Sequence, residues 1–216
     1  MAHDTTNLSP DTPLEYQSSI GRLNIFGFWV FLGAEIILFS TIFATFFVLN
    51  GHAGNMGGME HMSHAGHGAP MPKELFELGN TLVMTIVLLV SSFTCGLAIH
   101  EMRKRNVKAM NIWLVITLLL GLTFLYLEIA EFIHLVHEGA TLGTNGYWSS
   151  FYFLTGTHGL HVSLGIGWMI LIILQVIKRG LTPETAKKVF IVSLYWHFLD
   201  FVWIFVYTGV YLLGMV

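Results

Sequence analysis

Five long apolar stretches, separated by polar residues, dominate the pattern of the chain. Hydrocarbon about 30 Å thick is crossed by roughly 20 residues of helix, so each stretch is long enough to span a membrane with some tilt. The pattern predicts an all-α fold in which residues 24–216 form one bundle of five transmembrane helices behind a polar segment at 1–23. The predicted spans are Asn24–Leu49, Leu78–Ile99, Ile112–Val136, Phe151–Ile177 and Val189–Val216.

The composition excludes several classes of protein. Hydrophobic residues make up 54% of the 216 residues and charged residues only 11%, less than half of the roughly 25% typical of soluble domains. A soluble enzyme of this size would need a charged surface that this chain cannot supply. The single cysteine, Cys95, excludes an intrachain disulfide and a sulfur-ligated metal cluster.

The distribution of lysine and arginine predicts the orientation. One side of the predicted bundle carries all of these residues except Lys73. Basic residues in short loops mark the cytoplasmic side, so we expect a cytoplasmic N-terminus and an external C-terminus. Because the N-terminal segment is polar and partly acidic, it differs from a secretory signal peptide. We therefore expect a membrane protein that passes through the bilayer several times.

The external loop at 50–77 is rich in glycine, methionine and histidine. His61, His64 and His67 recur at a spacing of three and are a weak candidate for copper or zinc binding. Nothing in the sequence fixes the geometry of a metal site, so adventitious affinity is the preferred interpretation.

Eight ionisable side chains fall inside the predicted spans, where burial is costly and each is by default a functional hypothesis. A rise of about 1.5 Å per residue places three of them near the midplane, and four others between the midplane and the external surface. The midplane group is Glu35, His161 and Asp200; the second group is Glu128, Glu131, His134 and His158; the eighth residue is His197.

Depth and spacing indicate which of these groups meet. Glu35 has no polar residue one turn away on its own helix, so its partner must come from another span or another protein. The second group could form a set of carboxylates and imidazoles between the third and fourth spans. His197 and Asp200 are three residues apart on one helix and could pair.

Two interpretations of the intramembrane groups compete. They form a proton path, as chains of acids and histidines do in pumps, or they are hydrogen-bonded pairs that orient helices and bind lipid headgroups. The structural interpretation is preferred for His158, His161, His197 and Asp200, whereas both stay open for Glu35. No set of convergent histidines at matched depth predicts a heme or copper site. We therefore expect no catalytic centre and no resident redox metal in this chain.

Three long motifs resemble subunit III of the heme-copper respiratory oxidases. GFWVFLGAEIILFSTIFATFF at 27–47 is similar to that family's helix with a glutamate in mid-membrane, the position of Glu35 here. GTHGLHVSLG at 156–165 resembles its helix with paired histidines. SLYWHFLDFVWIFVYTGVYL at 193–212 is similar to its final helix. The resemblance covers all five spans, and the seven-helix members of the family carry two further helices before the glutamate helix.

The resemblance implies an accessory role. Subunits of this family bind neither heme nor copper, which belong to the catalytic subunit I. They hold phospholipid, sustain proton uptake or oxygen access, and protect the catalytic subunit from damage during turnover. The implied partners are subunits I and II, a small subunit IV and membrane lipid, with no nucleic acid.

The most specific inference from the resemblance is the identity of the electron donor. EYQSSIGRLN at 15–24 and SSFTCGLAIHEMR at 91–103 look most like the quinol oxidase subunits of Gram-positive bacilli, for which the donor is menaquinol. The alternative within the family is a cytochrome c oxidase. A hypothesis of another class is a free-standing membrane carrier or metal-handling protein that uses the buried acids and the histidine-rich loop.

Overall fold

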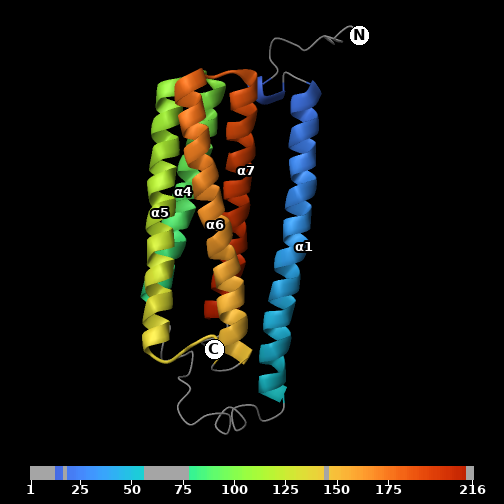
Figure 1. The fold of residues 1–216 in the computed structure, drawn as a ribbon, viewed down its shortest axis with the longest axis vertical. Coiled ribbons are helices and arrows are strands. Elements are labelled where there is room, and N and C mark those ends of the chain that lie inside the picture. Colours follow the sequence, from blue (N-terminus) through green and yellow to red (C-terminus); the bar gives the residue numbers. More distant parts are fainter. Residues whose placement is uncertain (1–12, 17–18, 56–77, 144–145, 213–216) are drawn as a thin grey trace.

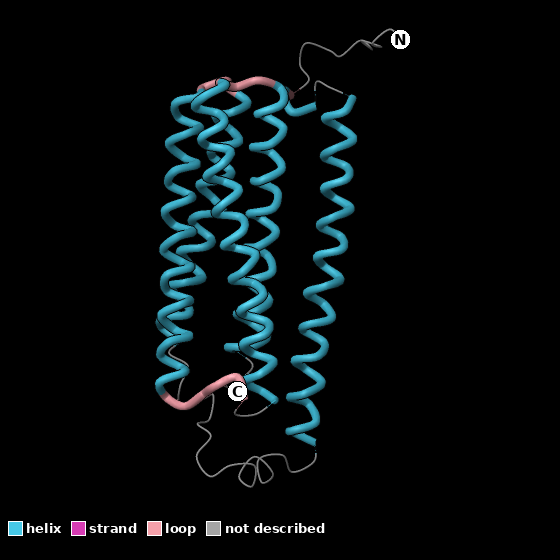
Figure 2. Tube along the Cα trace, viewed as in Figure 1, coloured by secondary structure: helices cyan, strands magenta, loops and turns pink. Residues whose placement is uncertain are grey.

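Five long helices run side by side in the structure, a computed structural model that describes residues 13–16, 19–55, 78–143 and 146–212 (Figures 1 and 2). Each is long and apolar enough to cross a membrane. The all-α class and the five spans are therefore confirmed. In chain order the elements are η1 (Leu14–Tyr16), α1 (Ser19–Asn55), α4 (Leu78–Arg103), α5 (Val107–His137), α6 (Gly146–Arg179), α7 (Pro183–Val206) and the π-helical η2 (Tyr207–Leu212).

The helices are longer than the apolar stretches that predicted them. α1 begins before Asn24 and continues past Leu49, and α6 begins at Gly146 rather than at Phe151. A helix continues beyond the hydrocarbon until a cap or a turn stops it, so hydrophobicity alone underestimates its length. The fifth span differs in kind, because its α-helix ends at Val206 and the chain continues as a π-helical turn.

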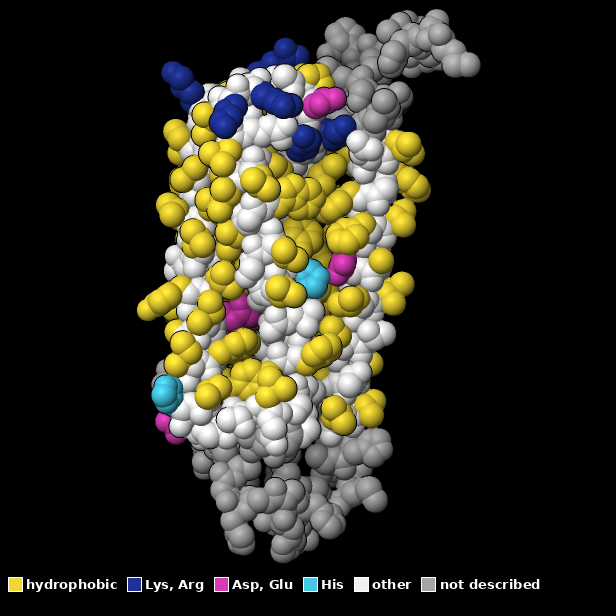
Figure 3. Space-filling view, viewed as in Figure 1, with side chains coloured by type: hydrophobic (Ala, Val, Ile, Leu, Met, Phe, Trp, Pro, Cys, Tyr) yellow, Lys and Arg dark blue, Asp and Glu magenta, His cyan; other side chains and the backbone are white. Residues whose placement is uncertain are grey.

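Local capping sets the ends of the helices at their connections. The Asn106 side chain accepts a backbone N–H one turn into α5. Gly180 follows α6 at φ +70°, a left-handed conformation that favours glycine. Two residues later, Thr182 and Thr185 form a reciprocal capping box at the start of α7. Both connections lie at one end of the molecule, which we call the basic end because lysine and arginine gather there (Figure 3).

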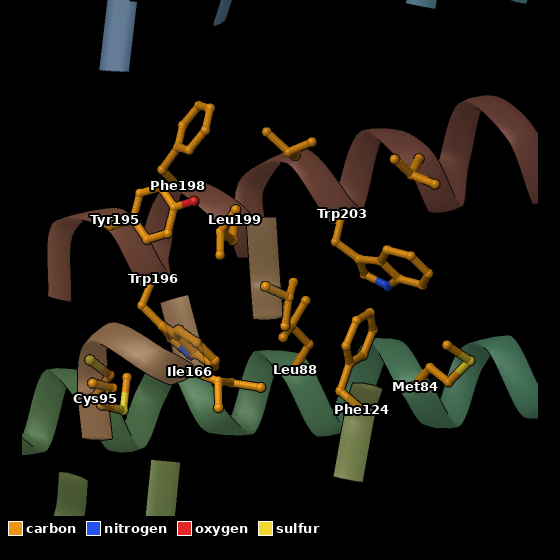
Figure 4. Packing of buried hydrophobic residues seen from close by; sticks show 14 of the residues in the cluster. Met84, Leu88, Cys95, Phe124, Ile166, Tyr195, Trp196, Phe198, Leu199 and Trp203 are labelled. Carbon is orange, nitrogen blue, oxygen red and sulfur yellow. The ribbon is translucent and has the colours of Figure 1, made fainter. Parts of the chain in front are cut away.

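α4, α5, α6 and α7 form a closely packed bundle around two tryptophans of α7 (Figure 4). Trp196 lies against Gly121 of α5, where an added Cβ would be 2.6 Å from the indole ring. The same ring lies beside Gly165 of α6, and its Nε1–H donates to Ser91 Oγ of α4 at 3.0 Å. One side chain thus joins α7 to the other three helices of the bundle.

Trp203 repeats this arrangement two turns further along α7. Its Nε1–H donates to Thr85 Oγ1 of α4 at 3.1 Å. Its ring contacts the ring of Phe124 on α5 edge to face, with centroids 4.7 Å apart. Hydroxyl side chains of α4 therefore satisfy the polar edges of both indoles in the bundle interior, as small polar residues do between membrane helices.

α1 lies at the side of this bundle, against α6 and α7 (Figure 1). Only 17% of the most apolar stretch of α1 is buried, against 67% for α7. Phenylalanines make much of the contact: the ring of Phe28 meets Trp168, that of Phe39 meets Phe198, and that of Phe43 meets Phe205. The remaining surface of the molecule is a broad apolar belt that suits contact with lipid or other membrane proteins (Figure 3).

The short helix η1 closes the basic end beside α7. Its Glu15 side chain is fully buried and accepts from Nε and Nη2 of Arg103 at 3.2 and 3.0 Å. Tyr16 packs edge to face on Phe190 of α7. Part of the segment predicted only as polar is therefore docked on the bundle.

Candidate functional site: a proton-sharing pair between α1 and α6

A hydrogen-bonded pair of a glutamate and a histidine in the middle of the molecule joins α1 to α6. Glu35 Oε2 lies 3.1 Å from His161 Nε2. The two side chains are only 13% and 15% exposed. The sequence predicted that both residues lie near the midplane and that the partner of Glu35 comes from another element. The structure identifies that partner as His161.

The hydrogen bonds of His161 limit where the protons of the pair can be. Its Nδ1 lies 2.7 Å from the carbonyl oxygen of Thr157, and because a carbonyl only accepts, Nδ1 carries a hydrogen. The proton between Nε2 and Glu35 then resides either on the ring, giving imidazolium and carboxylate, or on the carboxyl, giving two neutral groups. Both states have zero net charge. The pair can therefore hold a transferable proton in the membrane without a net buried charge.

Aromatic and backbone contacts hold the pair in position. The His161 ring packs against Phe39 with ring centroids 5.2 Å apart. The Tyr195 hydroxyl of α7 donates to the His161 carbonyl oxygen at 3.3 Å. These contacts come from α1 and α7, so the site forms only where the three helices meet.

Two grooves flank α1 on the side of the pair away from the basic end. One, of about 640 Å³, lies between α1 and α6 and includes Thr41, Thr45 and Phe153 in its lining. The other, of about 710 Å³, lies between α1 and α7 and is lined largely by aromatic residues such as Phe43 and Phe205. α1 thus touches the bundle along a narrow contact with apolar space on both sides.

The four groups predicted between the third and fourth spans are only partly together. The Glu128 carboxyl lies against Gly159 of α6, as an added Cβ there would be 2.8 Å from Oε2. Glu131 instead accepts from the hydroxyl of Tyr211 in η2 at 3.3 Å. His134 is exposed on α5 and, among the described residues, forms no hydrogen bond or ion pair with either acid, so its predicted place in the set is wrong.

His158 is a core residue with a structural contact. It is fully buried, and its Nε2 lies 3.2 Å from the carbonyl oxygen of Leu199 on α7. The ring packs beside Trp203 and Phe124, with centroids 5.1 and 5.9 Å away. Its hydrogen bond therefore ties α6 to α7, as the structural interpretation expects.

The predicted pairing of His197 with Asp200 is replaced by a contact across helices. His197 Nδ1 is hydrogen-bonded to Ser92 Oγ of α4 at 2.6 Å, and Ser92 also faces the Asp200 carboxyl. Within the described residues, His197 and Asp200 form no hydrogen bond with each other. Positions three apart on a helix are neighbours, but the hydroxyl on α4 is nearer to the imidazole. These residues line a pocket of about 360 Å³ between α4 and α7.

Several residues that hold the helices together were absent from the sequence-based candidates. Trp196 is one of them, although Gly121 on α5 and Gly165 on α6 leave space for a large neighbour. Glu15 and Arg103 gave no signal, because they are distant in sequence and both lie near charged segments. The candidate metal ligands His61, His64 and His67 lie outside the described residues.

Comparison with known proteins places these features in a family. The family described as cytochrome c oxidase subunit III matches residues 17–215. The chain is 58% identical to quinol oxidase subunit 3 of Bacillus spizizenii and 57% identical to that of Bacillus subtilis, in each case over 95% of this chain and 94% of the relative. It is 52% identical to the probable quinol oxidase subunit 3 of Staphylococcus saprophyticus over its whole length and 98% of that protein.

These matches cover all five helices and include both members of the pair between α1 and α6. They also argue against a free-standing carrier, because a subunit III works within an oxidase complex. The protein is thus an integral membrane protein and part of a terminal oxidase. The chain belongs to the cytochrome c oxidase subunit III family, that is, to subunit III of the heme-copper oxidases.

Proposed function

We propose that this chain is the third subunit of an oxygen-reducing terminal oxidase whose electron donor is a quinol, with menaquinol as the specific donor. The electron donor is inferred from the 57–58% identity to two Bacillus proteins named quinol oxidase subunit 3. The identity extends over nearly the whole of this chain and of each relative. Identity at this level extends beyond the apolar positions that any membrane bundle shares. A cytochrome c oxidase is the alternative that the experiment below must exclude.

Within this proposal, catalysis belongs to a partner. Heme and copper reside in the catalytic subunit I, and this chain binds to it together with subunit II and a small subunit IV in the bacterial plasma membrane. The basic end faces the cytoplasm, in accord with the positive-inside rule. The broad apolar belt offers surface for these partners and for lipid.

The proposed role of this chain is to support the catalytic subunit in two ways. The Glu35–His161 pair holds one transferable proton at the membrane middle, which suits a role in sustaining proton uptake during turnover. The two grooves beside α1 hold phospholipid acyl chains, because their linings are largely apolar and they lie within the membrane span. Lipid bound there fills the space on either side of the narrow α1 contact.

Affinity purification of the tagged chain in a mild detergent tests this function. The preparation is examined by a reduced-minus-oxidised visible spectrum and by oxygen uptake with a menaquinol analogue and with reduced cytochrome c. We expect heme bands and uptake driven by the quinol alone. Uptake driven by cytochrome c would overturn the donor, and a folded preparation without heme would overturn the role. A preparation from cells with the untagged chain controls for contaminating oxidase.

A further inference from the structure

A second polar site lies inside the bundle, on the other side of α6 from the Glu35–His161 pair. Gly159 and His161 are two residues apart on α6, which corresponds to roughly 200° around the helix axis, so they point to opposite sides. The His161 side meets α1, and the Gly159 side meets Glu128 of α5. The two sites are therefore separate.

The Glu128 carboxyl is enclosed and fits closely against α6. The residue is only 3% exposed. Both oxygens and Cδ lie within 3.0 Å of the place that a Cβ on Gly159 would take. Glycine at 159 therefore makes room for the carboxyl, and any larger residue would displace it. Within the described residues, neither oxygen of Glu128 has a hydrogen-bond partner.

Other polar groups surround this carboxyl. Glu131 and Glu128 are close enough for their charges to interact, and Tyr211 interacts with both acids and with Tyr147. The Tyr147 hydroxyl is buried and, like Glu128, has no hydrogen-bond partner in the described part of the chain. Buried polar groups almost always pair with protein or with ordered water. The region around Glu128 thus combines two acids and the Tyr211 phenol, and Tyr211 in turn interacts with Tyr147.

The contacts indicate which acid carries a proton. Two neighbouring carboxylates that are both buried disfavour a state in which both are charged. Glu131 accepts a hydrogen bond from Tyr211, which favours its charged form, whereas Glu128 has no donor to stabilise a charge. The proton therefore resides on Glu128. A neutral carboxyl still needs one donor and one acceptor, and water supplies both.

We propose that Glu128 is a neutral carboxylic acid in an internal water site, so that this region of the bundle binds water and one exchangeable proton. A bound metal ion is the competing occupant, but no group of three or more His, Cys, Asp or Glu side chains that could hold one occurs among the residues that the structure describes. The site is independent of the electron donor, since it depends only on contacts among α5, α6 and η2.

Infrared spectroscopy of the purified oxidase complex tests the proposal. The spectrum of Glu128→Gln is subtracted from that of the unaltered complex, in H2O and in D2O. We expect a positive carboxylic acid C=O band that moves to lower frequency in D2O. The Glu131→Gln complex should retain this band. Glu35 is present in every complex, so its contribution cancels in each difference spectrum. If the band disappears in Glu131→Gln but persists in Glu128→Gln, the proton belongs to Glu131 and the proposal is overturned.

Two further outcomes would also overturn it. Absence of the band from the Glu128→Gln difference would mean that Glu128 is ionised, as a bound cation requires. A band that does not move in D2O would mean a dry site without exchange.

A pair of glycine variants offers a second readout if Glu128→Gln fails to assemble. Gly159→Ala should shift or split the Glu128 band, because the new methyl group displaces the carboxyl. Gly156→Ala is the matched control on the same helix, as its Cβ meets nothing within 4 Å. An unchanged band in Gly159→Ala would contradict the placement of the acid against α6.

Discussion

The four-helix bundle and the α1 contact are built in different ways. In the bundle, Trp196 and Trp203 insert between helices and their N–H groups donate to hydroxyls of α4. At the α1 contact, phenylalanine rings touch across a narrow seam, with grooves of about 640 and 710 Å³ on either side. The hydrogen-bonded pair Glu35–His161 is the polar link at mid-height of that seam.

Under the proposed function, the bundle holds the fold together and the pair at the α1 seam handles a proton. Close packing and neutral hydrogen bonds hold the bundle, so a change there should reduce stability first. The α1 seam has little packing to lose, and its central pair can exchange a proton. A change in that pair should leave stability nearly intact and alter behaviour during turnover. The variants below test this division, in order of expected effect on stability.

Trp196→Ala should have the largest effect. It empties the space between Gly121 and Gly165 and leaves Ser91 without its indole donor. Removal of a large buried aromatic side chain costs about 3–5 kcal/mol of stability. Thermal unfolding in detergent measures the loss, and Trp168→Ala at the α1 seam is the comparison. Equal losses in the two variants would contradict the division.

Gly121→Ala should destabilise the bundle by overpacking. The new methyl carbon would lie 2.6 Å from the Trp196 ring, so the ring or the helices must move. Such insertion costs about 1–3 kcal/mol. Gly167→Ala is the matched control, because its Cβ meets nothing within 4 Å. The packing described for Trp196 would be wrong if both alanine variants unfolded at the same temperature.

Ser91→Ala and Ser92→Ala compare two neighbouring hydroxyls. Ser91 accepts from an indole that is almost fully buried, whereas Ser92 bonds to His197, which is exposed. We expect Ser91→Ala to lose about 1 kcal/mol, since a buried N–H stays unpaired. Ser92→Ala should lose less, as its partner can bond elsewhere. Chemical unfolding of both proteins checks the order, and a larger loss in Ser92→Ala would reverse our interpretation of the α4 hydroxyls.

Glu35→Gln should change stability least. A glutamine amide still reaches His161 and keeps a hydrogen bond, so we expect a loss of no more than about 0.6 kcal/mol, the average for hydrogen bonds between membrane helices. The same unfolding assay measures it. A loss of stability as large as that of Gly121→Ala would show that the pair serves chiefly to hold α1 against α6.

The sequence predicted the fold well, but it predicted the contacts of the intramembrane polar side chains only in part. Apolar length alone defined five spans, and depth placed Glu35 and His161 at the same level. Depth measures position along the membrane normal but not rotation about a helix axis, so it could not separate true neighbours from residues at equal depth. His134 was misplaced for this reason. His197 was assigned to Asp200 because spacing on one helix is visible in a sequence, whereas Ser92 on α4 is not.

The π-helical turn explains one further contact that the sequence did not predict. A regular α-helix, at 100° per residue, would place Tyr211 on the face that carries His197 and Asp200, but η2 changes that angle after Val206. The Tyr211 hydroxyl instead reaches Glu131 of α5. Neither hydrophobicity nor spacing signals such a turn in a single sequence.

Turnover-dependent inactivation of the assembled oxidase shows whether the Glu35–His161 pair handles a proton. Complexes with the unaltered subunit, with Glu35→Gln and with the exposed control Glu138→Gln are normalised by heme content. Oxygen uptake is then followed to the loss of activity. We expect a near-normal initial rate for Glu35→Gln and a several-fold smaller number of turnovers before inactivation, with Glu138→Gln unchanged. Equal lifetimes in all three complexes would contradict a proton role for the pair between α1 and α6.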